Sequence, residues 1–489
     1  MVVERLDPRP SAFVFSLRSV GYSLETAVAD IIDNSIAAGC SSIRVFFSNE
    51  QDSKLVLIDD GEGMDASELK EAMRLGSKSP MEQREHTDLG RFGLGMKTAS
   101  FSICKRLTVV SSNGNQRVAA RWDLDEIATN NAWNLDVLTP EEINELPFIE
   151  ELKSNGTAII WEKIDKIIDE SSRNKQKDLV SAISNLEKHL ALTFHRYIEG
   201  EKGLKKLNIY INNHKIEAFD PFNKKNLATY VLEQDVIPLN GSKVTITPYI
   251  LPHHSKTKTD EYEKYAGEGG YFVNQGFYVY RNKRLISHGG WFRIISPKVS
   301  TQLARVQIDI SNELDDIWNI DVKKSVATPP IIIRDRLKST IEKIMGKSTR
   351  VYEGRGRVQH MDGLTYVWNQ VVTSGGKIQY KLNTEHPLIK RMVSYLEPKQ
   401  ESEFFVLLDM ISKTFPTDLL FSQYSSKPKE VEQNSIDEEQ LLNVAVMIAQ
   451  EKLKDEQNKT QILSSFEKMP PFNEYIEAIS ARLEKEGIQ

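Results

Sequence analysis

The sequence has little cysteine and no long apolar run, and each absence excludes a class of protein. Only two cysteines, Cys40 and Cys104, occur among 489 residues, without a CxxC pair or a Cys/His cluster. A disulfide scaffold or a structural zinc site is therefore not expected, and a reducing compartment is. We find no apolar stretch long enough to span a bilayer and no signal peptide. These absences predict a cytoplasmic protein with no membrane partner.

No strong excess of either charge is present. The net charge is −6, with 27% charged and 40% hydrophobic residues, which is ordinary for a globular protein. The molecule as a whole is therefore not an electrostatic nucleic-acid binder, although a local basic face would still suit phosphates. The length allows roughly two to four domains.

Hydrophobic periodicity predicts an α/β fold in three parts. Residues 1–204 form the first domain, a mixed sheet with helices on one face, and residues 205–345 form a second α/β domain. Residues 346–489 form a mixed, mainly helical C-terminal domain that could serve dimerisation or the binding of a partner or DNA. The expected elements of the first domain are a helix from Ser23 to Gly39, strands at 42–48, 54–59 and 155–164, a capping box at Asp65–Glu68, a hairpin turn at Asn113–Gly114 and a helix at 175–197.

The first of three chemically distinct blocks lies on the helix that follows Ser23. Asp30 and Asn34 are four residues apart and share one helix face, with Asp33 nearby. A carboxylate can take a proton from an attacking water, and an amide oxygen can bind Mg²⁺. Taken alone, this block is explained more simply as a solvent-exposed acidic face of a helix.

The second block is a strand that runs into an aspartate and spaced glycines. The apolar strand ends at Asp59, and Gly61, Gly63 and Met64 follow. Such glycines let the backbone approach a flat ligand, and the carboxylate could accept the exocyclic amine of adenine. A glycine-rich turn after an edge strand explains this block equally well.

The third block is a glycine cluster before a helix. Gly90, Gly93 and Gly95 precede Lys97, and free amides at a helix N-terminus with a lysine form an anion site. The block is not a Walker A loop, because Met96 separates Gly95 from Lys97, and it lacks the glycine order of the dinucleotide fingerprint.

Together the blocks resemble the GHKL superfamily of ATPases, which includes gyrase-type topoisomerases, heat-shock chaperones, histidine kinases and MutL. The order of the blocks matches its N box, its DxGxG motif and its GxxGxG lid motif, and Thr157 matches a fourth position. The resemblance implies a Bergerat-type α+β sandwich that binds ATP and Mg²⁺, with Asn34 as the metal ligand. The residues it assigns to nucleotide binding are Asn34, Asp59, Gly61, Gly63, Met64, Lys78, Gly90, Phe92, Gly93, Leu94, Gly95, Lys97 and Thr157.

Within the superfamily, the motifs look most like those of MORC ATPases and bacterial MutL-like proteins. The segment FYVYRNKRLI resembles part of their transducer domain, and WNIDVKKSVATPP lies where MutL carries a lysine-bearing loop. The resemblance therefore implies that Lys323 or Lys324 reaches the γ-phosphate. Solvated lysines in a loop are the alternative interpretation.

The sequence also departs from the family pattern at the position of the general base. Asp30 takes the place of the family's glutamate general base, and its side chain is one methylene shorter. Because a misplacement of about 1 Å can cost roughly a hundredfold in rate, we expect slow ATP hydrolysis. We have no physical account of Ala37, which replaces a second aspartate of the family.

The expected partners also follow from the resemblance. It implies an ATP-dependent homodimer that closes as a clamp, and the basic stretch Arg334–Arg357 is the candidate contact for double-stranded DNA. A partner nuclease or helicase and a role in restriction-modification or phage defence fit this interpretation. The alternatives are a chaperone-like ATPase that remodels proteins, an ATP-binding scaffold with little turnover and, for the basic stretch, an ordinary solvated helix face.

Overall fold

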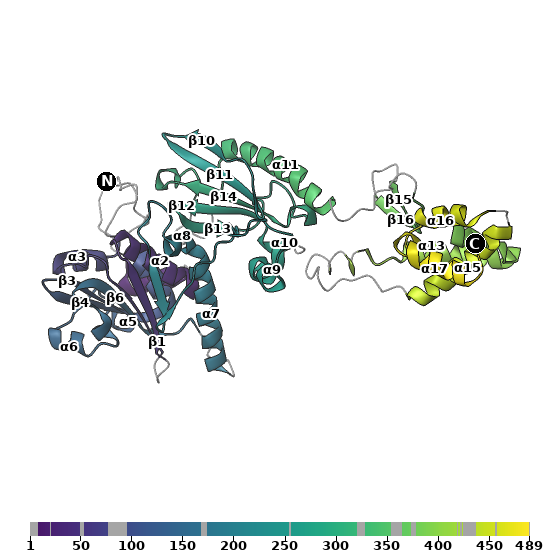
Figure 1. Ribbon diagram of the computed structural model, residues 1–489. Coiled ribbons are helices and arrows are strands. Elements are labelled where there is room, and N and C mark those ends of the chain that lie inside the picture. Colours follow the sequence, from purple (N-terminus) through teal and green to yellow (C-terminus); the bar gives the residue numbers. More distant parts are fainter. Residues whose placement is uncertain are drawn as a thin grey trace, which may run out of the picture. The chain divides into compact units, whose positions relative to one another are not determined.

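The chain forms two compact units in the computed structural model, Met1–Thr349 and Arg350–Gln489, and each is described by itself (Figure 1). The mixed α/β class and the mainly helical C-terminal region are as predicted. The structure describes residues 8–19, 21–48, 53–76, 95–167, 174–253, 256–319, 328–353, 364–372, 378–417, 419–420, 423, 437–454 and 457–488.

The first unit contains an eight-stranded sheet with the order β5-β4-β3-β6-β2-β1-β7-β8. Strands β1 and β7 run parallel, and the other neighbouring pairs are antiparallel. The strands are β1 (Ser42–Ser48), β2 (Lys54–Asp59), β3 (Cys104–Asn113), β4 (Arg117–Asp123), β5 (Asp136–Val137), β6 (Asn155–Ile164), β7 (Asn208–Ile211) and β8 (His214–Lys215). The central pairs place the end of β2 beside the start of β6, with Ile58 opposite Ala158.

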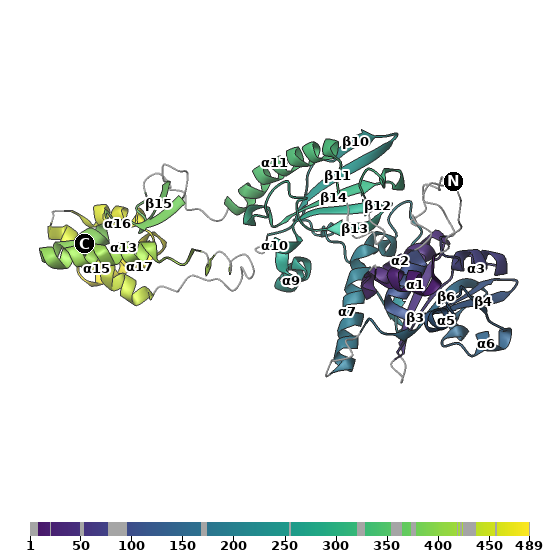
Figure 2. The same cartoon turned by 180° about the vertical axis from the view of Figure 1, so that it is seen from behind.

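Most helices of this part share one apolar core with one face of the sheet (Figures 1 and 2). They are α1 (Pro10–Arg18), α2 (Leu24–Ala37), α3 (Ala66–Met73), α4 (Gly95–Ile103), α5 (Leu124–Asn130), α7 (Lys175–Thr193) and α8 (His195–Glu199). The predicted capping box opens α3, where Asp65 accepts from the Glu68 amide and Glu68 accepts from the Asp65 amide. Local hydrogen bonding therefore sets this helix start, as the sequence indicates.

The expectation that helices cover only one face of the sheet is wrong. A short segment with α6 (Pro140–Asn144) and the 3₁₀ helix η1 (Ile149–Glu151) packs on the opposite face, in a second core. Alternate residues of β2 supply the two cores: Leu55 and Leu57 face one, and Val56 and Ile58 face the other. Because both faces of the central strands are apolar, both need a cover.

A second sheet of the same unit has the order β10-β11-β14-β12-β13, and β9 pairs with β11. Strands β12 and β14 run parallel, and β12 and β13 form an antiparallel pair. The elements are β9 (Tyr230–Val231), β10 (Asp235–Leu239), β11 (Ser242–Ile250), α9 (Thr259–Ala266), α10 (Gly270–Asn274), β12 (Gly276–Arg281), β13 (Arg284–His288), η3 (Val299–Thr301), β14 (Ala304–Ile310), η4 (Asn312–Leu314) and α11 (Ile331–Glu353).

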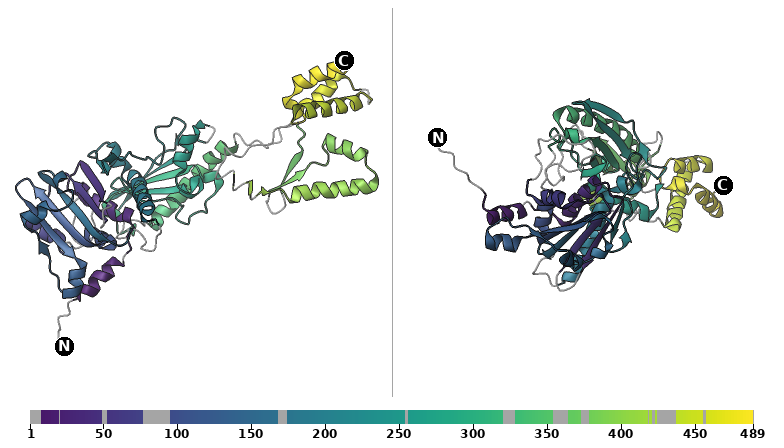
Figure 3. Two further views of the ribbon diagram at one scale, coloured as in Figure 1. Left: turned by 90° about the horizontal axis from the view of Figure 1, so that it is seen from below. Right: turned by 90° about the vertical axis from the view of Figure 1, so that its left-hand side faces the viewer.

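The C-terminal unit combines a two-stranded sheet with helices (Figure 3). Its elements are β15 (Trp368–Val372), β16 (Ile378–Leu382), α12 (Pro387–Ser394), α13 (Pro398–Lys413), α15 (Glu438–Lys454), α16 (Lys459–Glu467), η5 (Phe472–Glu474) and α17 (Ile476–Lys485). A core of its own joins α15, α16 and α17. Among the residues that the structure describes, no helix is both long and apolar enough to cross a membrane.

Candidate active site

Helix α2 carries the first group of predicted site residues. Asp30 is only 2% exposed, and the Tyr22 hydroxyl donates to its Oδ2 over 2.8 Å. Gly95, the first residue of α4, lies next to it, because a Cβ at position 95 would be 3.7 Å from Asp30 Oδ2. The start of α4, with its free backbone amides, is therefore beside a buried carboxylate.

An arginine of the second sheet reaches the same helix. Arg284, at the start of β13, places Nε 3.2 Å from Asp33 Oδ1 and Nη2 3.9 Å from Asp30 Oδ1. Arg284 and Asp33 are both buried. Sequence reasoning missed Arg284 as a site residue, and its presence in FYVYRNKRLI was the only available signal.

Asp59 ends β2 and contacts α2 through Ser35, five residues after Asp30. It is 7% exposed and accepts three hydrogen bonds, from Ser35 Oγ (2.7 Å), the Gly61 amide (2.9 Å) and the Thr157 amide (3.2 Å). Burial raises the pKa of Asp59, and these hydrogen bonds oppose that shift only in part. The structure thus brings the backbone amide of Thr157 to the carboxylate of Asp59.

The glycines near Asp59 allow unusually close backbone approach. A Cβ at Gly63 would lie 1.9 Å from the Ser112 carbonyl oxygen, and a Cβ at Gly156 would lie 2.1 Å from the Asp59 carbonyl oxygen. Both glycines also have positive φ, 75° and 140°. Any side chain at these positions would push β2, β3 and β6 apart.

Hydroxyl groups complete this end of the site. The Met64 amide donates to Ser111 Oγ over 2.8 Å, and that oxygen lies 3.0 Å from Thr157 Oγ1. Gly61 is equally confined, since a Cβ there would be 2.9 Å from the Ala38 carbonyl oxygen. The segment 61–64 is therefore held against β3 and β6.

The predicted metal ligand, Asn34, lies on the exposed face of α2. Asn34 is exposed one helical turn beyond Asp30, so its amide oxygen is accessible to a hydrated cation. Within the described ranges, no cluster of three or more His, Cys, Asp or Glu could hold a metal ion. Because Mg²⁺ is commonly held by one or two side chains together with substrate phosphates, a single Asn34 ligand is chemically suitable.

Lys97 is buried, and its ammonium caps a neighbouring helix. Its Nζ donates to the Ala72 carbonyl oxygen (2.8 Å) and to the Arg74 carbonyl oxygen (2.7 Å), at the C-terminal end of α3. Burial lowers the pKa of Lys97 to about 8. In this arrangement the amine is hydrogen-bonded to the end of α3.

The remaining predicted site residues lie outside the described residues: Lys78, Gly90, Phe92, Gly93, Leu94, Lys323 and Lys324.

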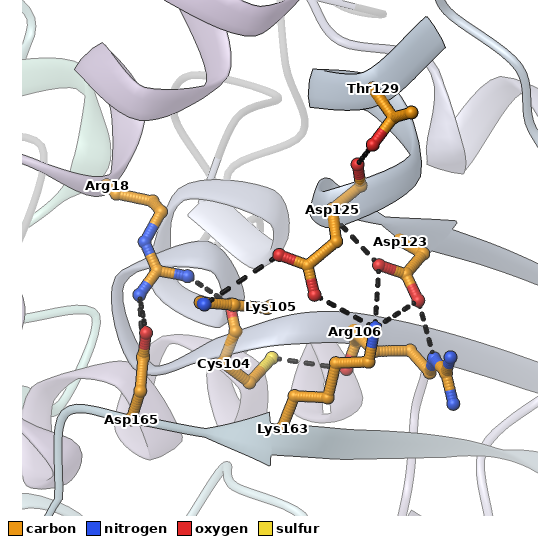
Figure 4. Close-up of polar contacts among 9 residues, drawn as sticks. All are labelled: Arg18, Cys104, Lys105, Arg106, Asp123, Asp125, Thr129, Lys163 and Asp165. Atoms are coloured by element: carbon orange, nitrogen blue, oxygen red, sulfur yellow. Dashed lines mark hydrogen bonds and ion pairs between the residues drawn. The ribbon is translucent and has the colours of Figure 1, made fainter.

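A separate polar cluster attaches α1 and α5 to the sheet (Figure 4). Arg18 donates to Asp165 and to the Cys104 carbonyl oxygen, while Asp123 accepts from Lys163 and Arg106. Burial disfavours the charge on Asp123, but hydrogen bonds from Lys163 and Arg106 outweigh it and lower the pKa of that carboxyl. Each of these ion pairs has one partner with a buried side chain, Arg18 or Asp123, which gives the cluster a structural role.

The first sheet and its helices form an α/β arrangement with one buried carboxylate at Asp30 and another at Asp59. Residues 22–157 match the model of the family described as histidine kinase-, DNA gyrase B-, and HSP90-like ATPase. The match includes Asp30, Asp59 and Thr157, and it supports the GHKL superfamily for this part of the chain. ATP binding and a general ATP-hydrolysing activity are supported with it.

Proposed function

We propose that this protein is a Mg²⁺-dependent ATPase that forms an ATP-gated homodimeric clamp on double-stranded DNA, similar to MutL and MORC proteins. One observation carries the catalytic part: Asp30 of α2 is buried beside the start of α4, while Asp59 is buried beside Thr157 and contacts the same helix through Ser35. The carboxylate proposed to bind the base and the carboxylate proposed to activate water thus both lie at α2.

Each residue then has a chemical task. Asp59 accepts the exocyclic amine of adenine, and the amides that begin α4 bind phosphate oxygens. Asp30 orients and deprotonates the attacking water, and Asn34 would hold Mg²⁺, which neutralises phosphate charge when bound. Lys323 or Lys324 stabilises the charge on the γ-phosphoryl group, and the lid residues Lys78, Gly90, Phe92, Gly93 and Leu94 complete the proposed site.

The DNA part of the proposal rests on charge. In the described part of the basic stretch, Arg334, Arg336, Lys338 and Lys343 are exposed on α11. The opposite side of α11 is buried through Ile333, Leu337, Ile341 and Ile344. A row of exposed cations suits sequence-independent contacts to phosphates. Cytoplasmic action with a partner nuclease or helicase, in restriction or phage defence, belongs to the same proposal.

The test measures ATP hydrolysis with and without double-stranded DNA while the oligomeric state is followed. We expect DNA to stimulate turnover and ATP to drive dimerisation. Asp30→Asn should lower turnover by about a hundredfold or more while ATP still binds, because a general base contributes roughly 10²–10⁴-fold.

Glu25→Gln is the matched control, because it removes a carboxylate from the first turn of the same helix, away from Asp30. It should keep the wild-type rate. ATP binding without turnover in the wild type would favour a scaffold instead. Turnover that ignores DNA would favour a chaperone-like ATPase, and either result would overturn the clamp.

A further inference from the structure

A tight turn of the second sheet contacts the proposed catalytic helix. Strand β12 ends at Arg281 and β13 begins at Arg284, with Asn282 and Lys283 between them at φ 47° and 71°. Two residues with positive φ are typical of the two-residue turns that join antiparallel strands without splaying them. The turn thus holds two arginines, three positions apart, on a rigid hairpin.

Arg284 joins this turn to α2. Its guanidinium is 3.2 Å from Asp33 and 3.9 Å from Asp30, and it lies 5.8 Å from the centre of the Phe194 ring. A separate contact joins the turn to α8, where the Tyr197 hydroxyl donates to the Asn282 carbonyl oxygen over 2.7 Å. Buried charge-assisted contacts are short-ranged and directional, so the position of α2 depends on the position of β13.

Arg281 joins the same turn to another segment. Its Nε and Nη2 each lie 2.7 Å from an oxygen of Asp315, in a buried bidentate pair. Asp315 directly follows η4, and the Asn282 amide donates to the Ile310 carbonyl oxygen over 3.0 Å. A displacement of the turn would therefore move α2 and residues 310–315 together.

We propose that Arg284 is a positioning residue for Asp30, and that the Arg281–Arg284 turn couples α2 to residues 310–315. The second sheet thereby controls ATP hydrolysis without taking part in adenine binding. This inference rests on the proposed ATPase function and adds its regulation. Arg284 bridges two carboxylates of one helix, so its loss removes the alignment of Asp30 but leaves the environment of Asp59 intact.

The decisive experiment separates turnover from binding in Arg284→Met. We expect kcat to fall roughly tenfold to a hundredfold, as a misplacement of about 1 Å can cost. The affinity for a non-hydrolysable ATP analogue should stay at the wild-type value. Arg284→Lys, which retains the charge, should recover part of the lost kcat. An Arg284→Met protein with wild-type kcat would overturn the inference.

Lys283→Met is the matched control in the same turn. Its ammonium pairs with Glu201 at 3.3 Å and with Asp309 at 4.0 Å, rather than with a carboxylate of α2 or with Asp315, so kcat should be unchanged. Should Arg284→Met fail to fold, because a buried charge loses its partner, the double variant Asp33→Asn/Arg284→Met removes both charges. It should fold and remain slow, and a folded double variant with wild-type kcat would contradict the proposal.

Hydrogen–deuterium exchange provides a readout that is independent of turnover. In Arg284→Met, amides of α2 and of residues 310–315 should both exchange faster, while those of Lys283→Met should not. Exchange confined to the β12–β13 hairpin would refute the coupling. If the wild type neither binds nor hydrolyses ATP, the proposed function fails on that result alone, and the exchange data still decide on the turn.

Discussion

The two buried carboxylate sites at α2, one with Asp30 and Asp33 and the other with Asp59, are stabilised in different ways. Among the residues that the structure describes, the hydrogen-bond donors to Asp59 are neutral groups of Ser35, Gly61 and Thr157. Asp30 and Asp33 instead face a guanidinium from the second sheet. One end of the site is thus assembled within the ATPase domain, and the other depends on a residue about 250 positions away.

Under the proposed function, this difference separates nucleotide binding from hydrolysis. The Asp59 end can be complete whatever the second sheet does, because all its donors belong to residues 22–157. The Asp30 end changes whenever Arg284 moves. Such an arrangement would let nucleotide bind first and be hydrolysed only when the second sheet is in place, which is the behaviour expected of a gated ATPase.

The largest effect on this comparison is expected from Asp59→Asn. An amide offers one acceptor oxygen where the carboxylate offers two, and a hydrogen bond to a charged group contributes about 1.5–3 kcal/mol. We expect ATP to bind roughly tenfold to a hundredfold more weakly, with kcat at saturating ATP maintained. Isothermal titration and steady-state kinetics would measure both. A fall in kcat at unchanged affinity would mean that the two ends are not separate.

A smaller effect, on kcat and not on ATP affinity, is expected from Tyr22→Phe. This change removes the hydroxyl that donates to Asp30 Oδ2 and keeps the ring in place. Losing a hydrogen bond of about 1 kcal/mol should lower kcat roughly fivefold. ATP affinity should not change, and the same two measurements test it. Weaker ATP binding with normal kcat would assign Tyr22 to the adenine end instead.

The smallest effect is expected from a change of pH. It should alter the stability of the fold and leave the two carboxylate sites unchanged. Burial lowers the pKa of His189 to about 4 and that of His195 to about 3. In the folded protein both side chains stay neutral well below pH 6.5. In the unfolded chain they become protonated below about pH 6.5. The contribution of these two histidines to stability should therefore be constant above this pH and fall as the pH is lowered from 6.5 towards 4.

Unfolding by urea at a series of pH values measures this slope. His195→Gln should flatten it, because it removes the ring whose Nε2 lies 2.8 Å from the Tyr280 hydroxyl of β12. His214→Gln is the control, since the side chain of His214 is 76% exposed. An unchanged slope in His195→Gln would contradict the burial argument.

Much of the ATPase domain could be predicted from short-range patterns. The helix after Ser23, the strands at 42–48 and 54–59, and the capping box at Asp65 depend on periodicity and on hydrogen bonds between near neighbours. The C-terminal unit was less predictable. Strands β15 and β16 pair there, and a pairing between strands leaves no periodic signal in either strand alone.

The sequence by itself determined the three blocks, their order and the helices and strands that carry them, because glycine positions and apolar periods act over a few residues. Only the tertiary structure decided where the buried charges meet. It placed Lys97 on the carbonyl groups of α3 and Arg284 against Asp33. The physical reason is that burial and ion pairing depend on how two sheets pack, and no local pattern encodes a contact between residues 251 positions apart.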